Sequence, residues 1–452
     1  MKASKVAFQD INSAMRFDGS YHLSEGTIYL KKLRKMPHKE LDDLTSEIFT
    51  AGRSKRIYTE EQFGYPYLSN SDVVRLNPIS SCNYNSKKYG YDAPSFLKEG
   101  MIVTGRVGAV GQTAYITSEF EEYETMGSDN IIRIVPKDMD KSGYIYSFLT
   151  SKYGNTLLWR LAAGGVQPYI SEDMLRDMPI PMLSETKQQQ IHNLIVEASK
   201  LRVEANKLLK EAVEYFEEEI GGTKVHLGYQ TGKISSKALN TFHKRLDGQF
   251  QLLWKDLESE KKDELKYESL WSFAKTIFVG GRGKRLYTET GVPFLSSSDM
   301  MLFNPKRESK KVSKRTPGLN NMMVSKYDIL ISRSGTVGNT VLVGDDLAET
   351  AISEHALRLI IDSEKISPKY VFCFLKTKYG MKCMEASSFG SVIITLNEDL
   401  IGNIDLPILE NKHQEIINYK VELYLQKMDE ATLKENQAIN LIENEIEQWQ
   451  TS

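Results

Sequence analysis

The sequence predicts an α+β protein in which two similar mixed α/β domains are joined by two long antiparallel α-helices, packed like a coiled coil. Two observations lead to this prediction. The 452-residue chain repeats itself at a shift of 226 to 229 residues, and each copy is followed by a long amphipathic helical pattern. Because the period is about half the chain, the repeat indicates a duplicated domain and not a solenoid of short units.

The repeat is clearest in a basic segment. AGRSKRIYTEEQFGYPYLSNSDV at 51–73 returns as GGRGKRLYTETGVPFLSSSDM at 280–300. Further segments return in the same order: RFDG at 16–19 as RLDG at 245–248, GRVGAVGQT at 105–113 as SRSGTVGNT at 332–340, YIYSFLTSKYG at 144–154 as YVFCFLKTKYG at 370–380, and SEDMLRDMPIPML at 171–183 as NEDLIGNIDLPIL at 397–409. The shared order shows that one module occurs twice.

Residues 1–182 are interpreted as the first domain. Short apolar runs at 101–107 and 131–136 predict strands, and the segment 144–154 predicts one helix. A first connector helix is expected at 183–220, followed by glycines that end it and by a polar linker at 221–244. The second domain is expected at 245–408 and the second connector helix at 409–452.

Each connector helix carries an apolar stripe with steps of three and four residues. The first stripe consists of Ile191, Leu194, Ile195, Ala198, Leu201, Ala205, Leu208, Ala212, Phe216 and Ile220. The second consists of Ile417, Val421, Tyr424, Met428, Ala431, Ala438, Ile442 and Trp449, with the polar residues Glu435 and Glu445 on the same line. We expect the two stripes to pack against each other. The same reasoning predicts that residues 1–222 alone form a two-fold dimer.

The charge distribution is uneven. Residues 183–220 hold 8 acidic and 5 basic residues and residues 409–452 hold 9 and 4, so the connector helices carry −8, whereas the whole chain carries −2 and the remainder +6. The acids therefore lie on the helices and the bases in the domains. The three cysteines have neither disulfide nor zinc-site spacing, and no signal peptide or membrane-spanning run is recognisable. These features indicate a cytoplasmic protein.

Catalytic motifs are not found. The segment GGRGKR lacks the first glycine and the final Ser or Thr of a phosphate-binding P-loop. Gly105, Gly108 and Gly111 lack the dinucleotide-binding spacing, and we expect them at chain corners that need positive φ. His355 has Asn130 as its counterpart in the first copy, whereas a catalytic base would be expected in both copies.

Basic and aromatic side chains on loops remain as candidate functional groups. Because loops on a rigid scaffold often carry function and basic groups bind phosphates, we expect these residues to contact double-stranded DNA. The candidates are Arg53, Lys55, Arg56, Tyr58, Arg106, Arg282, Lys284, Arg285, Tyr287, Lys310, Lys311, Lys314, Arg315 and Arg333.

The chain resembles the specificity subunits of type I restriction-modification systems. The resemblance is carried by the RFDG and RLDG openings, by GYPYLSNSDV and GVPFLSSSDM, and by DILISRSGTVGNT, SEHALRL, YVFCFLKTKYG and DLPILENKHQEII. The first copy departs from the pattern at MIVTGRVGAVGQT and SDNIIRI. The resemblance implies two target-recognition domains that are held apart by the connector helices and that read an asymmetric, gapped DNA site.

It also implies the partners. The specificity subunit would assemble with two methyltransferase subunits and, for cleavage, with restriction (motor-nuclease) subunits. It would have no catalytic residues, metal or cofactor of its own, and S-adenosylmethionine would belong to the methyltransferase subunits.

The segments that differ most between the copies, 79–95 against 306–321 and 164–170 against 389–395, are expected to read bases. The alternatives are a self-contained two-domain DNA methyltransferase or nuclease, and a scaffold whose basic loops are incidental.

Overall fold

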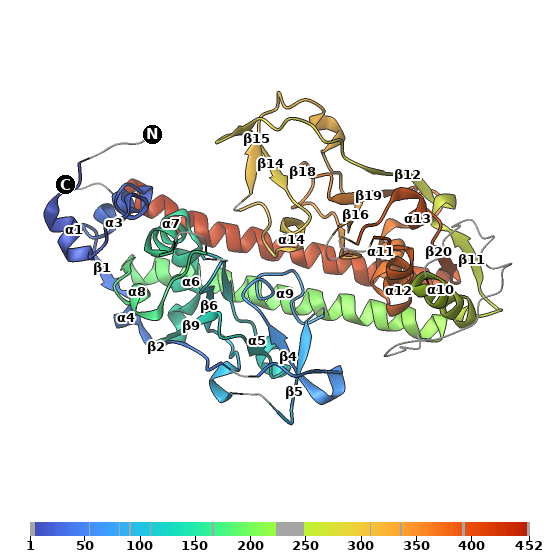
Figure 1. Ribbon diagram of the computed structural model, residues 1–452, viewed down its shortest axis with the longest axis horizontal. Coiled ribbons are helices and arrows are strands. Elements are labelled where there is room, and N and C mark those ends of the chain that lie inside the picture. Colours follow the sequence, from blue (N-terminus) through green and yellow to red (C-terminus); the bar gives the residue numbers. More distant parts are fainter. Residues whose placement is uncertain are drawn as a thin grey trace. The chain divides into compact units, whose positions relative to one another are not determined.

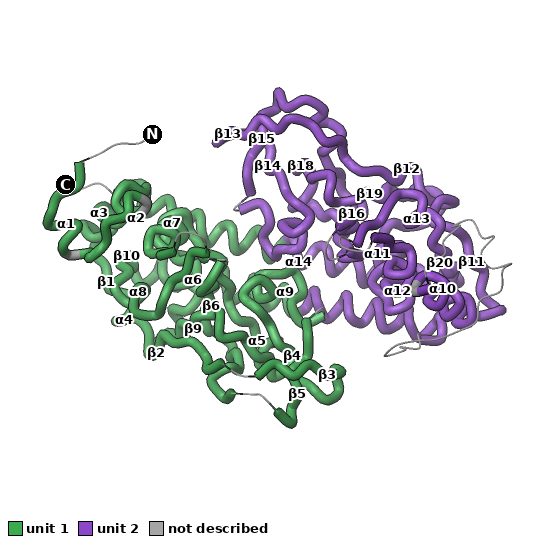
Figure 2. The backbone as a smooth tube through the Cα atoms, in the orientation of Figure 1, with its two compact units in different colours: residues 1–203, 430–452 green, residues 204–429 purple. Residues whose placement is uncertain are grey.

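The structure is a computed structural model that describes residues 5–449 except 54, 81, 90–91, 109, 165–166, 223–247, 308, 335–336 and 391–393. It divides into two compact units, residues 1–203 with 430–452 and residues 204–429 (Figure 2). The division falls within both connector helices. Most of the expected linker at 221–244, and the RLD of the second opening motif, lie outside the described residues.

Within its described residues, the first unit has ten short strands and, ahead of the first connector helix, eight α-helices (Figure 1). The strands are β1 (His38–Glu40), β2 (Thr45–Thr50), β3 (Tyr58–Thr59), β4 (Gly64–Leu68), β5 (Asn83–Ser86), β6 (Ile102–Gly105), β7 (Thr113–Tyr115), β8 (Met126–Gly127), β9 (Ile131–Pro136) and β10 (Pro179–Pro181). The helices are α1 (Phe8–Ala14), α2 (Gly19–His22), α3 (Glu25–Leu33), α4 (Leu41–Leu44), α5 (Ser118–Glu122), α6 (Ser142–Thr150), α7 (Lys152–Leu161) and α8 (Glu172–Arg176).

These strands form three sheets. One has the order β2-β9-β6-β7, a second has the order β3-β5-β4-β8, and β1 pairs with β10 alone. The runs 101–107 and 131–136 supply β6 and β9, as predicted, and both strands are buried because they lie in the interior of the first sheet. The main core of the unit joins this sheet to α6, α7 and the connector helices through Ile134, Phe148, Ile195 and Ile442.

The second unit repeats this design strand for strand. Its strands are β11 (Lys266–Ser269), β12 (Ala274–Val279), β13 (Tyr287–Thr288), β14 (Val292–Leu295), β15 (Lys310–Val312), β16 (Ile329–Ser332), β17 (Thr340–Leu342), β18 (Ala351–Ile352), β19 (Ala356–Ile361) and β20 (Asp405–Ile408). Its helices include α10 (Gly248–Glu260), α11 (Pro368–Lys376), α12 (Lys378–Ser387) and α13 (Glu398–Gly402). The sheet orders are β12-β19-β16-β17, β13-β15-β14-β18 and β11-β20. Even the β-bulges correspond, between Thr45 and Glu47 in one unit and between Ala274 and Thr276 in the other.

The segment expected as one helix at 144–154 is two helices. α6 ends at Thr150 and α7 begins at Lys152, because Ser151 has an extended conformation and its hydroxyl accepts a hydrogen bond from the Gly154 amide. Thr377 does the same between α11 and α12, with the Gly380 amide as donor. The glycine is required at this turn, since a Cβ on Gly154 would lie 2.1 Å from the Phe148 carbonyl oxygen.

The connector helices are α9 (Glu185–Ile220) and α14 (Asn411–Gln448). At the end of α9, Gly221 adopts a positive φ of 93°, which is the conformation expected after a helix. Most of the predicted stripe is buried, including Ile191, Ala205 and Phe216. Three predicted positions, Leu194, Leu201 and Leu208, are only half-buried, and Leu209 is buried beside the last of them, because the helical period drifts relative to a fixed heptad.

Within each unit the two connector helices lie side by side and run antiparallel, as predicted (Figure 1). In the first unit Lys187 pairs with Glu445, and Lys434 pairs with Glu197 at 3.0 Å. In the second unit Lys427 pairs with Glu204 at 2.6 Å, and Lys420 pairs with Glu211. Residue numbers rise along one helix as they fall along the other, which fixes the direction of packing. None of the helices in the described part of the chain has the length and apolar character needed to cross a membrane.

Candidate nucleic-acid interface

In both units the repeated basic segment leads into a short strand that ends in Tyr-Thr. β3 carries Tyr58 and β13 carries Tyr287, and each tyrosine is about half exposed. The edge strand β3 pairs with β5, and β13 pairs with β15. Both partner strands come from the segments that differ most between the copies. The variable segments are therefore hydrogen-bonded directly to the shared basic-aromatic segments.

In the first unit, an acidic side chain holds the arginines of the basic segment. Asp129 accepts from Arg53 Nε at 3.3 Å and from Arg56 Nη2 at 3.1 Å. The Asp129 side chain is 12% exposed, whereas the Arg53 side chain is 91% exposed. Tyr67, whose ring lies 5.6 Å from the Arg56 guanidinium carbon, raises the pKa of Arg56 together with Asp129. One face of each guanidinium is thus fixed and the other remains open to solvent.

The second unit has the same arrangement with a longer acid. Glu354 lies 3.8 Å from Arg282 Nε and accepts a hydrogen bond from Arg285. Glu354 is again 12% exposed and Arg282 is 79% exposed. The Arg285 guanidinium carbon lies 4.6 Å from the centre of the Phe294 ring, in a cation–π contact. Both units therefore present one exposed and one anchored arginine.

The acidic corner is defined as Asp129 and Asn130 in the first unit and as Glu354 and His355 in the second. A second loop, which carries Arg106 or Arg333, is hydrogen-bonded to this corner. The Arg106 amide donates to the carbonyl oxygen of Asn130 at 2.9 Å, and the Arg333 amide donates to that of His355 at 2.9 Å. Each acceptor follows Asp129 or Glu354 in the sequence. The predicted chain corner is present here, with Gly108 and Gly111 at φ values of 75° and 86°, whereas Gly105 is the last residue of β6.

The variable strand gives each unit different surface chemistry. In the second unit β15 presents Lys310 and Lys311, and Lys310 Nζ lies 5.6 Å from the centre of the Tyr287 ring. Lys314 and Arg315 follow on the next turn, and all four cations are exposed. In the first unit β5 carries Asn83, Tyr84 and Asn85 instead. The second unit is thus the more basic of the two at this edge.

Each unit has a buried arginine, on β9 or β19, that bonds to main-chain carbonyl oxygens outside its own sheet. Arg133 on β9 donates to the carbonyl oxygens of Gly127 at 2.6 Å and Ser95 at 2.9 Å, among others. Arg358 on β19 donates to the Met323 carbonyl oxygen at 2.7 Å. Burial lowers the pKa of both guanidinium groups to about 10. Since Gly127 belongs to β8, this bond ties the sheet that carries the basic segment to the sheet beneath it.

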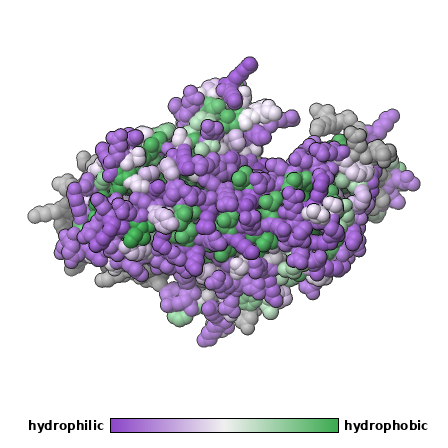
Figure 3. Space-filling model, turned by 180° about the vertical axis from the view of Figure 1, so that it is seen from behind, coloured by the Kyte–Doolittle hydropathy of each residue, from purple (hydrophilic) through white to green (hydrophobic). Residues whose placement is uncertain are grey.

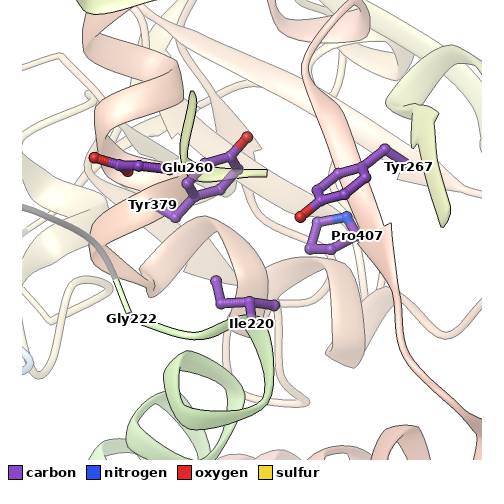
Figure 4. Close-up of a pocket in the computed structure, with 6 residues that line it drawn as sticks. All are labelled: Ile220, Gly222, Glu260, Tyr267, Tyr379 and Pro407. Carbon is purple, nitrogen blue, oxygen red and sulfur yellow. The ribbon is translucent and has the colours of Figure 1, made fainter. Parts of the chain in front are cut away.

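The described residues form little that could serve as a catalytic cavity. A hollow with about 200 Å³ of empty space lies in the second unit. Figure 4 shows it between the end of α9, at Ile220 and Gly222, and the side chains of Glu260, Tyr267, Tyr379 and Pro407. Much of that space is open to solvent, and the hollow encloses essentially no room for even a water molecule, whereas ligand pockets begin at roughly 300 Å³. Among the described residues, no group of three or more His, Cys, Asp or Glu side chains could hold a metal ion.

The face shown in Figure 3 is largely hydrophilic, with scattered hydrophobic side chains. Such scattered side chains are normal for a protein surface and do not by themselves mark an interface.

The structure brings six of the fourteen predicted site residues together, three in each unit. Arg53, Arg56 and Arg106 meet at the corner 129–130, and Arg282, Arg285 and Arg333 meet at the corner 354–355. Lys55 and Lys284 are exposed within the basic segments. Sequence reasoning missed Asp129 and Glu354. Their signal was present, because both are acidic and occupy the same place in the matching strings SDNIIRI and SEHALRL.

The sequence matches no protein-family model and no curated protein. The chain is nevertheless similar to solved structures. One is the S subunit of a type I restriction-modification system from M. genitalium, with 15% sequence identity, a TM-score of 0.35, and coverage of 90% of this chain and 94% of that chain. Another is the HsdS subunit from Thermoanaerobacter tengcongensis, with 12% identity, a TM-score of 0.29, and coverage of 91% and 95%.

A third is a chain from a structure that concerns the complex assembly and conformational transition of the type I R-M system. It has 13% identity and a TM-score of 0.30, and the match covers 91% of this chain and 97% of that chain. Over at least 90% of its length, the chain is similar to S subunits of type I restriction-modification systems, the family that its sequence motifs resemble.

Proposed function

We propose that this chain is the DNA-binding specificity subunit of a type I restriction-modification complex. Each unit reads one half of an asymmetric, bipartite, gapped site in double-stranded DNA, and the chain positions methyltransferase and restriction subunits on that site. The proposal rests on the sequence motifs and on one structural observation: an acid-anchored basic segment beside a variable strand is built twice.

The shared parts of the two units suit phosphate binding. Arg53 and Arg282 are the most exposed arginines of the basic segments and stand at matching positions. Exposed cations on a fixed backbone bind DNA phosphates without regard to sequence and set the register of the protein on the duplex. We therefore assign both residues, with Lys55 and Lys284, to phosphate contacts.

The differing parts suit base reading. Lys310 and Lys311 on β15 can donate to guanine O6 and N7, whereas Asn83 and Asn85 on β5 can pair with adenine N6 and N7. Asn85 is buried and its side-chain oxygen accepts from the Ile57 amide at 2.8 Å, so Asn83 is the better candidate of the two. Because the two strands carry different side chains, the two half-sites should differ.

The chain itself is assigned no catalytic step. Methyl transfer from S-adenosylmethionine would belong to two methyltransferase subunits, and cleavage to restriction subunits in the cytoplasm. His355, the one histidine beside an anchoring acid, is replaced by Asn130 in the first unit, which argues against a base that each unit needs. The proposal thus assigns DNA recognition to this chain and catalysis to its partner subunits.

The test is selection from a randomised DNA pool by the full chain with its methyltransferase partner. We expect an asymmetric consensus with two specified parts and an unspecified gap. Methylation or cleavage by the chain alone would instead support a self-contained enzyme, and binding without sequence preference would support a scaffold.

A matched pair of variants assigns the half-sites. Replacing Lys310, Lys311, Lys314 and Arg315 with alanine should relax the consensus in one half only. Replacing Asn83 with alanine should relax the other half only. Loss of preference in both halves from either variant would contradict independent reading by the two units.

A further inference from the structure

The interface between the connector helices is the same interface built twice, with residues shifted by 226. The Lys152 amide donates to Glu443 Oε1 at 2.6 Å in the first unit, and the Lys378 amide donates to Glu217 Oε1 at 2.6 Å in the second. Likewise Lys187 pairs with Glu445, and His413 lies 3.2 Å from Glu219. Each position on one helix therefore has a definite counterpart on the other.

A polar triad breaks this equivalence. In the first unit Glu435 is completely buried on the stripe of α14. It accepts from Arg202 Nη2 at 2.8 Å through one oxygen and from the Tyr146 hydroxyl through the other. A buried carboxylate is tolerated only when it is paired and hydrogen-bonded, and here both requirements are met.

The counterparts in the second unit are all apolar. The repeat relates Glu435 to Leu209, Arg202 to Met428 and Tyr146 to Phe372. All three counterparts are buried. The matching positions are thus filled by a charged network in the first unit and by apolar side chains in the second, so they are not interchangeable.

If either half of the chain paired with a copy of itself, the charges of Arg202 and Glu435 would no longer lie together. If a second copy of the first half replaced the second half, Leu209 would stand where Glu435 stands now, and Arg202, whose side chain is only 13% exposed, would meet no carboxylate. If a second copy of the second half replaced the first, Met428 would meet the buried Glu435. Each dimer contains this mismatch twice because of its two-fold symmetry. Exposed pairs such as Lys434 with Glu197 would also be lost, but solvent screens them.

We propose that the Tyr146–Glu435–Arg202 triad makes pairing of the two halves heterotypic: it favours the first connector helix on the second and disfavours either helix on a copy of itself. The triad thereby protects the chain from exchanging halves with other chains in the wrong combination. The proposal differs from the prediction that residues 1–222 alone form a two-fold dimer, which treats the halves as interchangeable and which the experiment below also bears on.

Two symmetrised full-length variants test the proposal. Tyr146→Phe/Arg202→Met/Glu435→Leu makes both ends apolar, and Leu209→Glu/Phe372→Tyr/Met428→Arg makes both ends polar. In each variant like helices can pair without an uncompensated charge. The control carries all six substitutions, which move the triad to the other unit and restore the asymmetry. Because the two symmetrised variants have opposite chemistry, failure of one to fold leaves the other as a test.

The readout is a cross-link between two copies of α9. In the chain, Glu204 of α9 pairs with Lys427 of α14, and the repeat relates Lys427 to Leu201. If two copies of α9 packed in the same way, residue 204 of one copy would lie beside residue 201 of the other, and the two copies of Val203 would lie almost opposite each other. Each protein therefore also receives Val203→Cys, is refolded from denaturant at high concentration, and is treated with a short bis-maleimide. Proteins without this cysteine give the background.

We expect the cross-linked α9–α9 dimer to rise by about tenfold or more in the symmetrised variants, because they lack the penalty of an unpaired buried charge. The starting protein and the six-fold control should stay at background. Equal cross-linking in all four proteins, or as much in the control as in the symmetrised variants, would overturn the proposal.

Discussion

Replacing Glu354 with glutamine should make DNA binding by the second unit tighter at low salt and more sensitive to salt. Glu354 lies within 3.8 Å of Arg282 and bonds to Arg285. The basic segment carries three positive charges, on these two arginines and on Lys284, and Glu354 compensates one of them. Glutamine keeps the size and the oxygen acceptor of the side chain but removes the negative charge. The arginines therefore remain placed while their net charge rises by one.

The size of the effect follows from counterion release. Each additional phosphate neutralised steepens the dependence of log K on log salt by about 0.9. Between about 50 and 200 mM salt, this slope corresponds to an additional loss of roughly 3- to 4-fold in affinity for the variant. Fluorescence anisotropy with a labelled duplex, titrated at several salt concentrations, measures both the slope and the low-salt affinity.

Glu364→Gln is the matched control. It removes the same charge from the same unit, but Glu364 is exposed and lies beyond the opposite end of β19 from Glu354. We expect its slope to equal that of the unaltered chain. Equal slopes in the two variants, or weaker low-salt binding by Glu354→Gln, would show that the acidic corner does not face DNA.

Three further outcomes are expected. Arg282→Ala should weaken binding similarly across DNA sequences and reduce the salt slope by about 1, as measured in the same anisotropy titrations. Burial lowers the pKa of His192 below its ordinary 6.5. The stability that its neutral form contributes is therefore present above about pH 6.5 and is lost as the pH falls through the folded-state pKa. His192→Asn should make the free energy of unfolding depend less on pH over that range. Gly380→Ala should destabilise the second unit by roughly 2 to 4 kcal/mol in thermal unfolding, because its Cβ would lie 2.1 Å from the Phe374 carbonyl oxygen, whereas Gly281→Ala, with open space around it, should be neutral.

The features predicted correctly from the sequence depend on periodicity within the chain. The repeat, the two amphipathic helices and the buried strands at 101–107 and 131–136 all leave a pattern that needs no knowledge of distant contacts. The antiparallel packing of the connector helices followed because neither apolar stripe had another partner.

The features that were missed depend on single side chains. The break at Ser151 comes from one hydroxyl that caps the next helix and from Gly154, which leaves room for the Phe148 carbonyl, within a run that otherwise has an apolar helical pattern. The role of Glu435 as a buried acceptor depends on Tyr146 and Arg202, which are far away in the sequence. The anchoring of Arg53 by Asp129 joins a loop to the approach of a strand 76 residues later. The repeat marks Asp129 and Glu354 as equivalent acids, but it does not say which residues they pair with.

Arg133 and Arg358 have a consequence for how new specificities could arise. Their partners are main-chain carbonyl oxygens, which every amino acid supplies, so the bonds do not depend on the side chains of the segments that they hold. The Ser95 carbonyl lies at the end of the 79–95 loop and the Met323 carbonyl just after the 306–321 loop, so the attachment of these two points persists when side chains within the loops are exchanged. A surface fastened in this way can diversify quickly, because a mutation that changes the reading of DNA need not be matched by a second mutation that keeps the domain folded.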